Sequence, residues 1–189
     1  MPPLSSAPYS PLARFRRTLR DTPPGFQILP DDWTRPLDLQ AAFAPLSGPL
    51  EIDIGCGKGR FLLARAAANP GTRFLGIDQQ AARLALLARR ARRAGLANIR
   101  LLYAEAAYAL ERLLPAGAAR VCYLFFPDPW PKRRHHRRRL VGIGFPDRIA
   151  SLLEPGGQFH AATDHLDYYR RIRALLQADA RLAEAPPFV

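Results

Sequence analysis

Cysteine is scarce in this chain, and histidine is nearly as rare. The 189 residues include two cysteines and four histidines. Cys56 lies inside a glycine-rich stretch and Cys122 inside an apolar run, and no set of Cys and His residues has the spacing of a disulfide framework or a zinc site. His135 and His136 are adjacent, so their side chains would diverge on a helix or a strand. We therefore expect no structural metal and a reducing compartment.

Long apolar runs are absent as well. The first ten residues lack the charged and apolar regions of a secretory signal, and no later stretch approaches the length of a membrane span. A chain of 189 residues is long enough for one compact domain with its own core. The sequence therefore predicts a soluble, cytoplasmic protein that does not enter a membrane.

Acidic residues are also in short supply. The chain has 16 Asp and Glu against 28 Lys and Arg, a formal net charge of +12 and a pI near 10.9. Such an excess favours a polyanionic partner, RNA or DNA, over an acidic protein or a neutral ligand. Part of the excess, including the Arg-Arg-Ala-Arg-Arg run at 89–93, is also what the arginine-rich composition of a high-GC genome would give without any partner.

Residues 1–48 differ in composition from the remainder. They are rich in proline and show no sustained apolar period. We interpret them as a Pro-rich basic N-terminal arm, with a short helix around residues 37–43 and with Trp33 docking onto the core. Residues 49–189 form the main domain in this interpretation. The basic residues of the arm include Arg14, Arg16, Arg17 and Arg20.

Strand and helix patterns alternate from residue 50 onward. We expect strands at 50–54, 73–78, 99–103, 121–126 and 158–163. We expect helices at 59–68, 81–94, 107–114, 145–153 and 166–176, with a Pro-Gly-Gly turn at 155–157. The alternation predicts an α/β fold, a doubly wound and mostly parallel sheet with helices on both faces. Such sheets bind ligands at the carboxyl ends of their strands.

A glycine loop follows the first of these strands. Gly55, Gly57 and Gly59 let the backbone approach a ligand closely at the start of a helix. A dinucleotide fingerprint needs a further glycine where Arg60 stands, and a phosphate loop needs Ser or Thr after Lys58, so neither phosphate-binding pattern is met. The plain alternative is a tight strand-to-helix turn without a ligand.

Carboxylates accompany this loop. Glu51 and Asp53 precede it, Asp78 ends the next strand, and Glu105 follows the third strand. Asp78 is placed to accept both hydroxyls of a ribose, and Glu105 an adenine amino group. A site with carboxylates and no phosphate clamp suits a cationic nucleoside, and S-adenosylmethionine fits this description. The alternative is that Asp53 and Asp78 are exposed strand-end residues.

Residues 125–139 read Phe-Phe-Pro-Asp-Pro-Trp-Pro-Lys-Arg-Arg-His-His-Arg-Arg-Arg. Asp128 lies between two prolines that restrict its backbone, so its carboxylate is preorganised beside Trp130 and suits holding a planar base. The alternatives are a turn-capping Asp128 and a Trp130 that only packs. The basic run at 132–139, Arg133 and Arg137 among it, is expected to bind phosphates with little sequence preference.

The segment 125–132, the basic run after it and Leu-Val at 140–141 resemble the signature of the tRNA (guanine-N7)-methyltransferase family. Ala-Thr-Asp at 162–164 resembles a later motif of that family, and the resemblance extends from about residue 50 to 176. It implies a class I, Rossmann-like methyltransferase domain. It also implies transfer of a methyl group from S-adenosylmethionine to N7 of a guanine in tRNA, in the variable loop at position 46.

The resemblance assigns roles to individual residues. It implies that Glu51, Asp78, Glu105 and Asp128 line the cofactor pocket, and that Asp128 is also the catalytic residue. By the same resemblance, Lys132 and Asp164 contact the substrate nucleotide. From its position after a strand, Asp164 also has a structural-cap interpretation, and His160 is expected to be a strand residue without a catalytic role.

Two family features have no counterpart in this sequence. The Thr-x-x-Glu motif of a C-terminal extension does not occur before Val189, and the N-terminal arm lacks the family's basic-glycine pattern. We therefore expect a short member, or one whose site a further segment or partner completes; a homo-oligomer stays open. Two other functions stay open too. The first is methylation of an exocyclic base amine, because residues 128–130 resemble the Asp/Asn-Pro-Pro-aromatic turn except at Trp130. The second is a non-catalytic, partner-dependent RNA-binding subunit.

Overall fold

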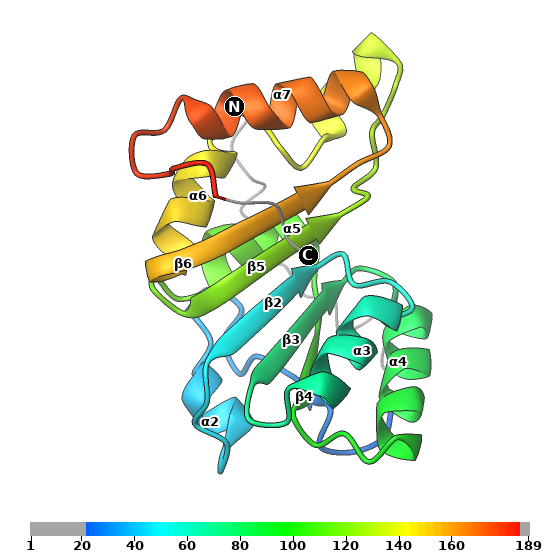
Figure 1. Ribbon diagram of the computed structural model, residues 1–189. Coiled ribbons are helices and arrows are strands. Elements are labelled where there is room, and N and C mark those ends of the chain that lie inside the picture. Colours follow the sequence, from blue (N-terminus) through cyan, green and yellow to red (C-terminus); the bar gives the residue numbers. More distant parts are fainter. Residues whose placement is uncertain (1–21, 186–189) are drawn as a thin grey trace.

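The computed structural model describes residues 22–185 as a single alternating series of strands and helices (Figure 1). The strands are β1 (Gln27–Ile28), β2 (Leu50–Ile54), β3 (Arg73–Asp78), β4 (Ile99–Tyr103), β5 (Ala119–Phe125) and β6 (Leu153–Ala162). The helices are α2 (Leu39–Phe43), α3 (Arg60–Ala68), α4 (Ala81–Arg93), α5 (Ala106–Tyr108), α6 (Phe145–Leu152) and α7 (Leu166–Gln177). A π-helix, η1 (Ala109–Leu113), continues α5, and a 3-10 helix, η2 (Arg133–Arg138), lies between β5 and α6.

All pairings within the described sheet are parallel. The strand order is β1-β4-β3-β2-β5-β6, so the chain builds outward from β2 first to one side and then to the other. The carboxyl ends of β2 to β6 consequently share one edge of the sheet, toward which the arrowheads in Figure 1 point. The predicted doubly wound α/β fold is confirmed.

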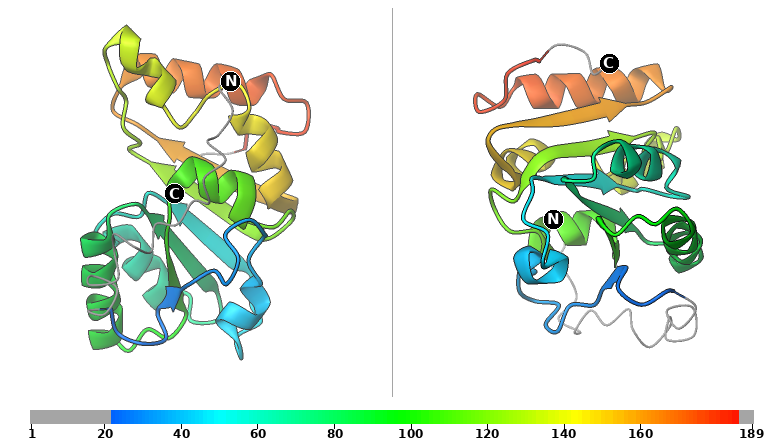
Figure 2. Two further views of the ribbon diagram at one scale, coloured as in Figure 1. Left: turned by 180° about the vertical axis from the view of Figure 1, so that it is seen from behind. Right: turned by 60° about the horizontal axis from the view of Figure 1, so that its bottom comes forward.

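Both faces of the sheet are buried because successive strand residues point to opposite sides. In β2, Leu50, Ile52 and Ile54 join a core cluster that also contains residues of α6 and α7. On the opposite face, Phe74 packs with α3 and α4. Figure 2 shows α5 and α6 on the face opposite that of α3 and α4. This double burial explains why apolar runs rather than alternating patterns mark the strands.

Part of the predicted N-terminal arm packs on the domain. Phe26, Ile28 and Phe43 are buried in the two core clusters. The partly buried Trp33 packs against the core, and Tyr108 donates its hydroxyl to the Trp33 carbonyl at 2.7 Å. The docking of Trp33 is therefore confirmed. A division of the chain at residue 48 stays a prediction, and the basic residues predicted between 14 and 20 lie outside the described residues.

Strand β1 was not predicted, several helix ends differ by one or two residues, and three other elements differ more. Strand β5 begins two residues early, at Ala119, and ends at Phe125. The helix expected at 107–114 continues from α5 into η1, where the Leu114 amide donates to the Ala109 carbonyl. Strand β6 begins at Leu153, and the Pro-Gly-Gly turn at 155–157 is a bulge in it, between the paired residues Leu153 and Gln158. The bulge shifts the register against β5 and so retains the predicted strand beyond it.

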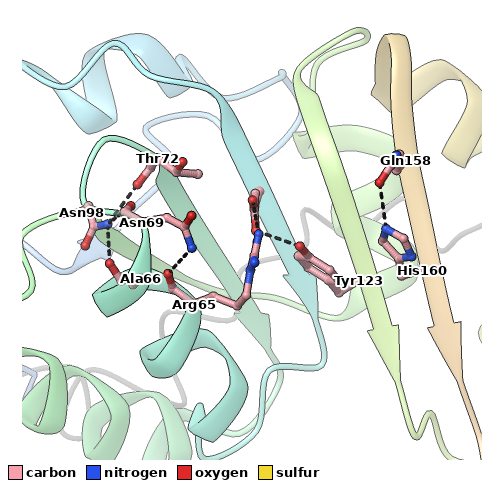
Figure 3. Close-up of polar contacts among 9 residues, drawn as sticks. Arg65, Ala66, Asn69, Thr72, Asn98, Tyr123, Gln158 and His160 are labelled. Atoms are coloured by element: carbon pink, nitrogen blue, oxygen red, sulfur yellow. Dashed lines mark hydrogen bonds and ion pairs between the residues drawn. The ribbon is translucent and has the colours of Figure 1, made fainter. Parts of the chain in front are cut away.

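A buried amide fixes the ends of α3 and β3 relative to β4. The Asn98 Nδ2 atom donates to the carbonyls of Ala66, Asn69 and Thr72 at 3.0 to 3.1 Å, as Figure 3 shows. Asn98 directly precedes β4 and is 4% exposed. Because these carbonyls end α3 and begin the turn into β3, Asn98 closes the end of the domain remote from the carboxyl edge.

Candidate functional site

The predicted site residues gather at the carboxyl edge of the sheet. The glycine loop follows β2, Asp78 ends β3, Glu105 follows β4, and Asp128 follows β5. Strands β2 and β5 are neighbours from which the chain proceeds in opposite directions, and doubly wound sheets form their ligand crevice at such a switch point. The topology therefore places the glycine loop and the Asp128 loop on the two sides of one crevice.

The glycine loop, residues 55–59, needs its glycines. Gly55, Gly57 and Gly59 have φ values of 75°, 54° and 70°, in the left-handed region where a Cβ is strained. The amides of Gly55 and Cys56 both donate to the Ile77 carbonyl, at 2.8 and 3.0 Å. A Cβ on Gly55 would meet nothing within 4 Å, so the loop keeps an open backbone surface there.

Helix α4 supports the glycine loop from behind. A Cβ on Gly59 would lie 2.2 Å from the Leu87 Cδ1 atom, so only glycine allows this close approach. The Arg90 guanidinium donates to the Lys58 carbonyl at 3.3 Å. The loop is thus held from β3 on one side and from α4 on the other.

Asp78 joins the glycine loop to the start of α4. Its Oδ2 accepts from the Gly57 amide at 2.9 Å, and its Oδ1 accepts from the Gln80 amide at 2.7 Å. Each carboxylate oxygen has a second lone pair available for a ligand hydroxyl. Asp78 is 7% exposed, so the interpretation as an exposed strand-end residue is wrong.

Glu51 is held by two side chains from other elements, and its place in the cofactor pocket stays a prediction. Its carboxylate pairs with Arg65 of α3, at 2.7 Å and 3.2 Å, and accepts from the Tyr123 hydroxyl at 2.8 Å. Figure 3 shows the side chains of Arg65 and Tyr123 directed toward each other. Burial raises the pKa of Tyr123, and the hydrogen bond to the Glu51 carboxylate raises it further. Glu51 thus fastens α3 to β5.

Asp53 is the acidic residue of β2 nearest to the glycine loop, and the predicted site set omitted it. It is 4% exposed, and burial raises its pKa to about 7, with a further contribution from the negative charge of Asp78. The sequence already indicated that Asp53 lies near the glycine loop, because Asp53 is two residues before Gly55 and Glu51 is four residues before it. Two carboxyl groups that repel one another in a buried place favour a cationic ligand between them.

Both cysteines lie close to this acidic pair. Cys56 and Cys122 are buried and free, and burial raises the pKa of each thiol. The charge of Asp53 raises both further. A thiol with a raised pKa stays protonated and unreactive, so the cysteines pack and do not act as nucleophiles.

Glu105 and Asp164 are exposed at the carboxyl edge. Glu105 is the N-cap residue of α5, yet its side chain makes no capping hydrogen bond. Asp164 follows β6, and the cap of α7 is the His165 ring, whose Nδ1 accepts from the Tyr168 amide. The structural-cap interpretation of Asp164 is therefore wrong, and its carboxylate faces solvent.

The Asp128 loop, residues 126–132, carries backbone strain. Phe126 and Trp130 have φ values of 52° and 41°, which non-glycine residues seldom adopt. The Phe126 amide donates to the Ala162 carbonyl at 2.7 Å, which ties the loop to the end of β6. Asp128 itself is exposed between these two strained residues. Strained backbone that the surroundings hold in place is typical of functional sites.

Arg139 holds this loop, which corrects its prediction as a phosphate contact. It is 7% exposed, and its Nε donates to the Pro129 carbonyl at 2.7 Å. Its two terminal nitrogens donate to the Asp167 carboxylate at 3.2 Å, and its guanidinium lies 4.7 Å from the centre of the Tyr168 ring. Arg139 therefore connects the Asp128 loop to helix α7.

The remaining cations of the basic run are exposed on and beside η2. This set comprises Lys132, Arg133, Arg134, Arg137 and Arg138. The Arg138 guanidinium lies 5.0 Å from the centre of the Trp130 ring, and the His135 ring meets the same indole edge-on. Trp130 is partly buried in these contacts. Trp130 therefore packs against its own basic neighbours, and the exposed cations follow Asp128 closely in the chain.

His160 lies in strand β6, as expected. Its ring stacks on Tyr123 at 5.7 Å, and its Nε2 pairs with the Gln158 side chain (Figure 3). Burial lowers the pKa of His160. Within residues 22–185, no three His, Cys, Asp or Glu side chains gather as ligands for a metal ion, and each helix is too short or too polar to span a bilayer.

Comparison with known proteins decides the family. The family described as "Putative methyltransferase" matches residues 47–186. A tRNA (guanine-N(7)-)-methyltransferase of Nitrosococcus oceani is 39% identical over 179 residues, which are 90% of this chain and 75% of that protein. The protein of the same name from Nocardia farcinica is 44% identical over 147 residues, 78% of this chain and 54% of that one. This chain belongs to the tRNA (guanine-N(7)-)-methyltransferase family.

Solved structures agree with the fold of this family. The antibiotic-resistance methyltransferase Kmr superposes with a TM-score of 0.52 at 25% identity, over 75% of this chain and 81% of that one. TrmN from Thermus thermophilus superposes with a TM-score of 0.56 at 25% identity, over 68% of this chain and 36% of that one. These similarities confirm the class I, Rossmann-like methyltransferase fold. The chain spans about half to three quarters of the length of its curated family relatives.

Proposed function

We propose that this protein transfers a methyl group from S-adenosylmethionine to N7 of a guanine in tRNA, and that the guanine is position 46 of the variable loop. Membership of the tRNA (guanine-N(7)-)-methyltransferase family supports the reaction and the substrate. The main structural support is the pair of loops at the carboxyl ends of the neighbouring strands β2 and β5. The glycine loop is open and bordered by carboxylates, and the other loop has Asp128 directly before the basic run at 132–138. A tRNA substrate would place this work in the cytoplasm.

The residues present fit S-adenosylmethionine. The glycine loop offers exposed backbone at Gly55 and Gly57, and the Asp78 oxygens keep lone pairs for ribose hydroxyls. Asp53 and Asp78 together favour a positively charged group, and Glu105 offers an exposed acceptor. When bound, S-adenosylmethionine supplies an electrophilic methyl group. Its sulfonium and amino cations are what this set of carboxylates would hold.

Asp128 would orient the guanine. The N7 lone pair needs no deprotonation, so positioning rather than proton abstraction is the task of the protein. The Asp128 carboxylate would accept hydrogen bonds from guanine N1 and N2 and stabilise the positive charge that grows on the ring. Lys132 and Asp164 would contact the substrate nucleotide, while Arg133 and Arg137 would bind neighbouring phosphates.

The test is transfer of labelled methyl to unmodified tRNA, followed by nucleoside analysis of the product. We expect 7-methylguanosine, and at least a tenfold fall in kcat/KM for Asp128→Ala with unchanged binding of S-adenosylmethionine. Glu154→Ala, which removes a carboxylate at the start of β6 and so at the strand end opposite the carboxyl edge, serves as the control. A methylated exocyclic amine, or binding of both ligands without transfer, would replace the proposed reaction. Near-normal transfer by Asp128→Ala would remove Asp128 from its role.

A further inference from the structure

Helix α4 carries a dense row of arginines on its outer side. Its buried side consists of alanine and leucine, among them Leu84, Leu87 and Ala91, so the helix packs firmly on β3 and β4. The α4 arginine face is the set Arg83, Arg89, Arg90, Arg92 and Arg93. By the helical rise, it extends about 15 Å from Arg83 to Arg93.

Few acidic residues accompany this face along the chain, and none forms an ion pair with it in the described part of the protein. Between residues 54 and 104 the sequence has ten Lys and Arg and one acidic residue, Asp78. Among residues 22–185, no ion pair involves an arginine of α4. Five like charges on one helix repel one another, so the face is destabilising unless an anion neutralises it.

Several arginines elsewhere in the described chain form ion pairs. Arg120 pairs with Glu154, Arg173 pairs with Glu184, and Arg181 pairs with both Asp147 and Asp179. An arginine-rich composition alone would distribute unpaired cations over every surface. Arg170 and Arg171 of α7 are also exposed and form no ion pair among the described residues, so α4 is set apart by its density of five arginines within residues 83–93. This density points to a function for the face.

The α4 arginine face is continuous with the crevice. The Arg83 guanidinium lies 4.0 Å from the place of a Cβ on Gly57, and Arg90 donates to the Lys58 carbonyl. Helix α4 begins three residues after Asp78, at the carboxyl edge, and extends away from it along the sheet. An anionic polymer that enters the crevice from this side would therefore pass over the arginines before it reaches the glycine loop.

We propose that the α4 arginine face binds the sugar-phosphate backbone of the tRNA, as a second anchor beside the basic run at 132–138. The proposal rests on the proposed function for its ligand. RNA is the polyanion that the crevice itself would receive, which favours it over an anionic membrane or an acidic protein. Two basic surfaces on either side of the crevice, after β3 and after β5, would hold the acceptor guanine between them.

The test uses Arg89→Gln/Arg92→Gln/Arg93→Gln in the full chain. These arginines are the ones remote from the glycine loop, and glutamine keeps the helix propensity. The matched control, Arg120→Gln/Arg173→Gln/Arg181→Gln, removes the same three charges from paired positions. For each protein, the Kd for tRNA is measured against salt concentration, together with the Kd for S-adenosylmethionine, kcat, and KM for tRNA.

For the α4 variant we expect the Kd and KM for tRNA to rise at least tenfold near 0.1 M salt. The slope of log Kd against log salt should fall by about 2 to 3, since each phosphate contact contributes roughly 0.7 to 0.9. The control should change the Kd less than twofold. The Kd for S-adenosylmethionine and kcat at saturating tRNA should equal those of the wild type in both variants.

Equal tRNA binding by the α4 variant and the wild type would overturn the proposal, as would an equal loss in the control. A third comparison measures binding to anionic phospholipid vesicles. Loss of vesicle binding with intact tRNA binding would assign the face to a lipid surface and overturn it too. If the wild type fails to form 7-methylguanosine, the proposed reaction fails by itself, and the tRNA Kd of the two variants still decides the proposal about α4.

Discussion

Two loops meet at the candidate site, and they reach similar backbone conformations in different ways. The glycine loop has three left-handed residues, all glycine. The Asp128 loop has two, Phe126 and Trp130, in which the same conformation costs roughly 1–2 kcal/mol each. The first loop is bonded to the adjacent strand β3, whereas the second is held by Arg139 and helix α7.

The two loops differ in which residues determine their backbone conformation. The glycine loop depends on its own residues and on Asp78, close by in sequence and in the sheet. The Asp128 loop depends on Arg139, which in turn needs Asp167 and Tyr168 from a helix that follows much later in the chain. The glycine loop should therefore respond to changes within itself, and the Asp128 loop to changes outside it.

The largest effect is expected from Gly59→Ala. The new Cβ would meet Leu87 at 2.2 Å and would also strain a φ of 70°. Together these costs should lower the free energy of unfolding by about 2–5 kcal/mol in urea denaturation. Gly95→Ala is the matched control, because Gly95 has a φ of 68° but nothing within 4 Å. Its cost should be about 1–2 kcal/mol. Equal costs at both positions would show that Leu87 moves aside.

The next effect concerns Asp53 and pH. Because its pKa in the folded protein is about 7, the folded state keeps a proton that the unfolded state releases near pH 4. The free energy of unfolding should therefore fall as pH rises from about 4 to about 7, by on the order of 1 kcal/mol per pH unit. Asp53→Asn should remove this slope and be the more stable protein at pH 8.

Urea denaturation of both proteins at several pH values gives the difference curve for Asp53. Other carboxyl groups titrate in both proteins and cancel in that difference. Asp78, the charged neighbour that raises the pKa of Asp53, is retained in both. Parallel curves for the wild type and Asp53→Asn would mean that Asp53 titrates in the ordinary range, and that the acidic pair does not prepare the glycine loop for a cation.

The sequence predicted the β2-to-β4 half of the fold closely, because its elements depend on local patterns. The strands predicted at 50–54, 73–78 and 99–103 match β2, β3 and β4 to the residue. Gly55 follows the first of them and Asp78 ends the second. The Pro-Gly-Gly segment was expected as a turn before a strand. Its backbone does turn, but strand pairing with β5 begins again on both sides of it, which is a tertiary effect that no local pattern contains.

The site was predictable as a set of positions but not as a set of contacts. The strand order brings the predicted residues to one edge of the sheet. The alternation of strands and helices in the sequence already implied this arrangement. The partners of Glu51, Arg65 and Tyr123, come from other elements, so no local pattern predicted these contacts. Arg139 was likewise indistinguishable from its basic neighbours in sequence, since only burial and the Pro129 carbonyl separate it from them.

We expect Arg139→Gln to have the smallest effect on stability. It is also the most direct test of the difference between the glycine loop and the Asp128 loop. The change leaves the Pro129 carbonyl and the strained Phe126 and Trp130 without their tie. It should lower the free energy of unfolding by about 1–2 kcal/mol, because Asp167 is largely exposed and regains water. Methyl transfer to tRNA should fall more than tenfold, while the Kd for S-adenosylmethionine stays unchanged.

Asp167→Asn supplies the control for this tie. The amide oxygen can still accept from Arg139, and the Pro129 contact remains, so transfer should fall less than twofold and stability by under about 1 kcal/mol. If Arg139→Gln weakened binding of S-adenosylmethionine and methyl transfer alike, the two loops would form one cooperative unit. If it changed neither, the strained conformation around Asp128 would be maintained by its own prolines, and the contrast between the loops would disappear.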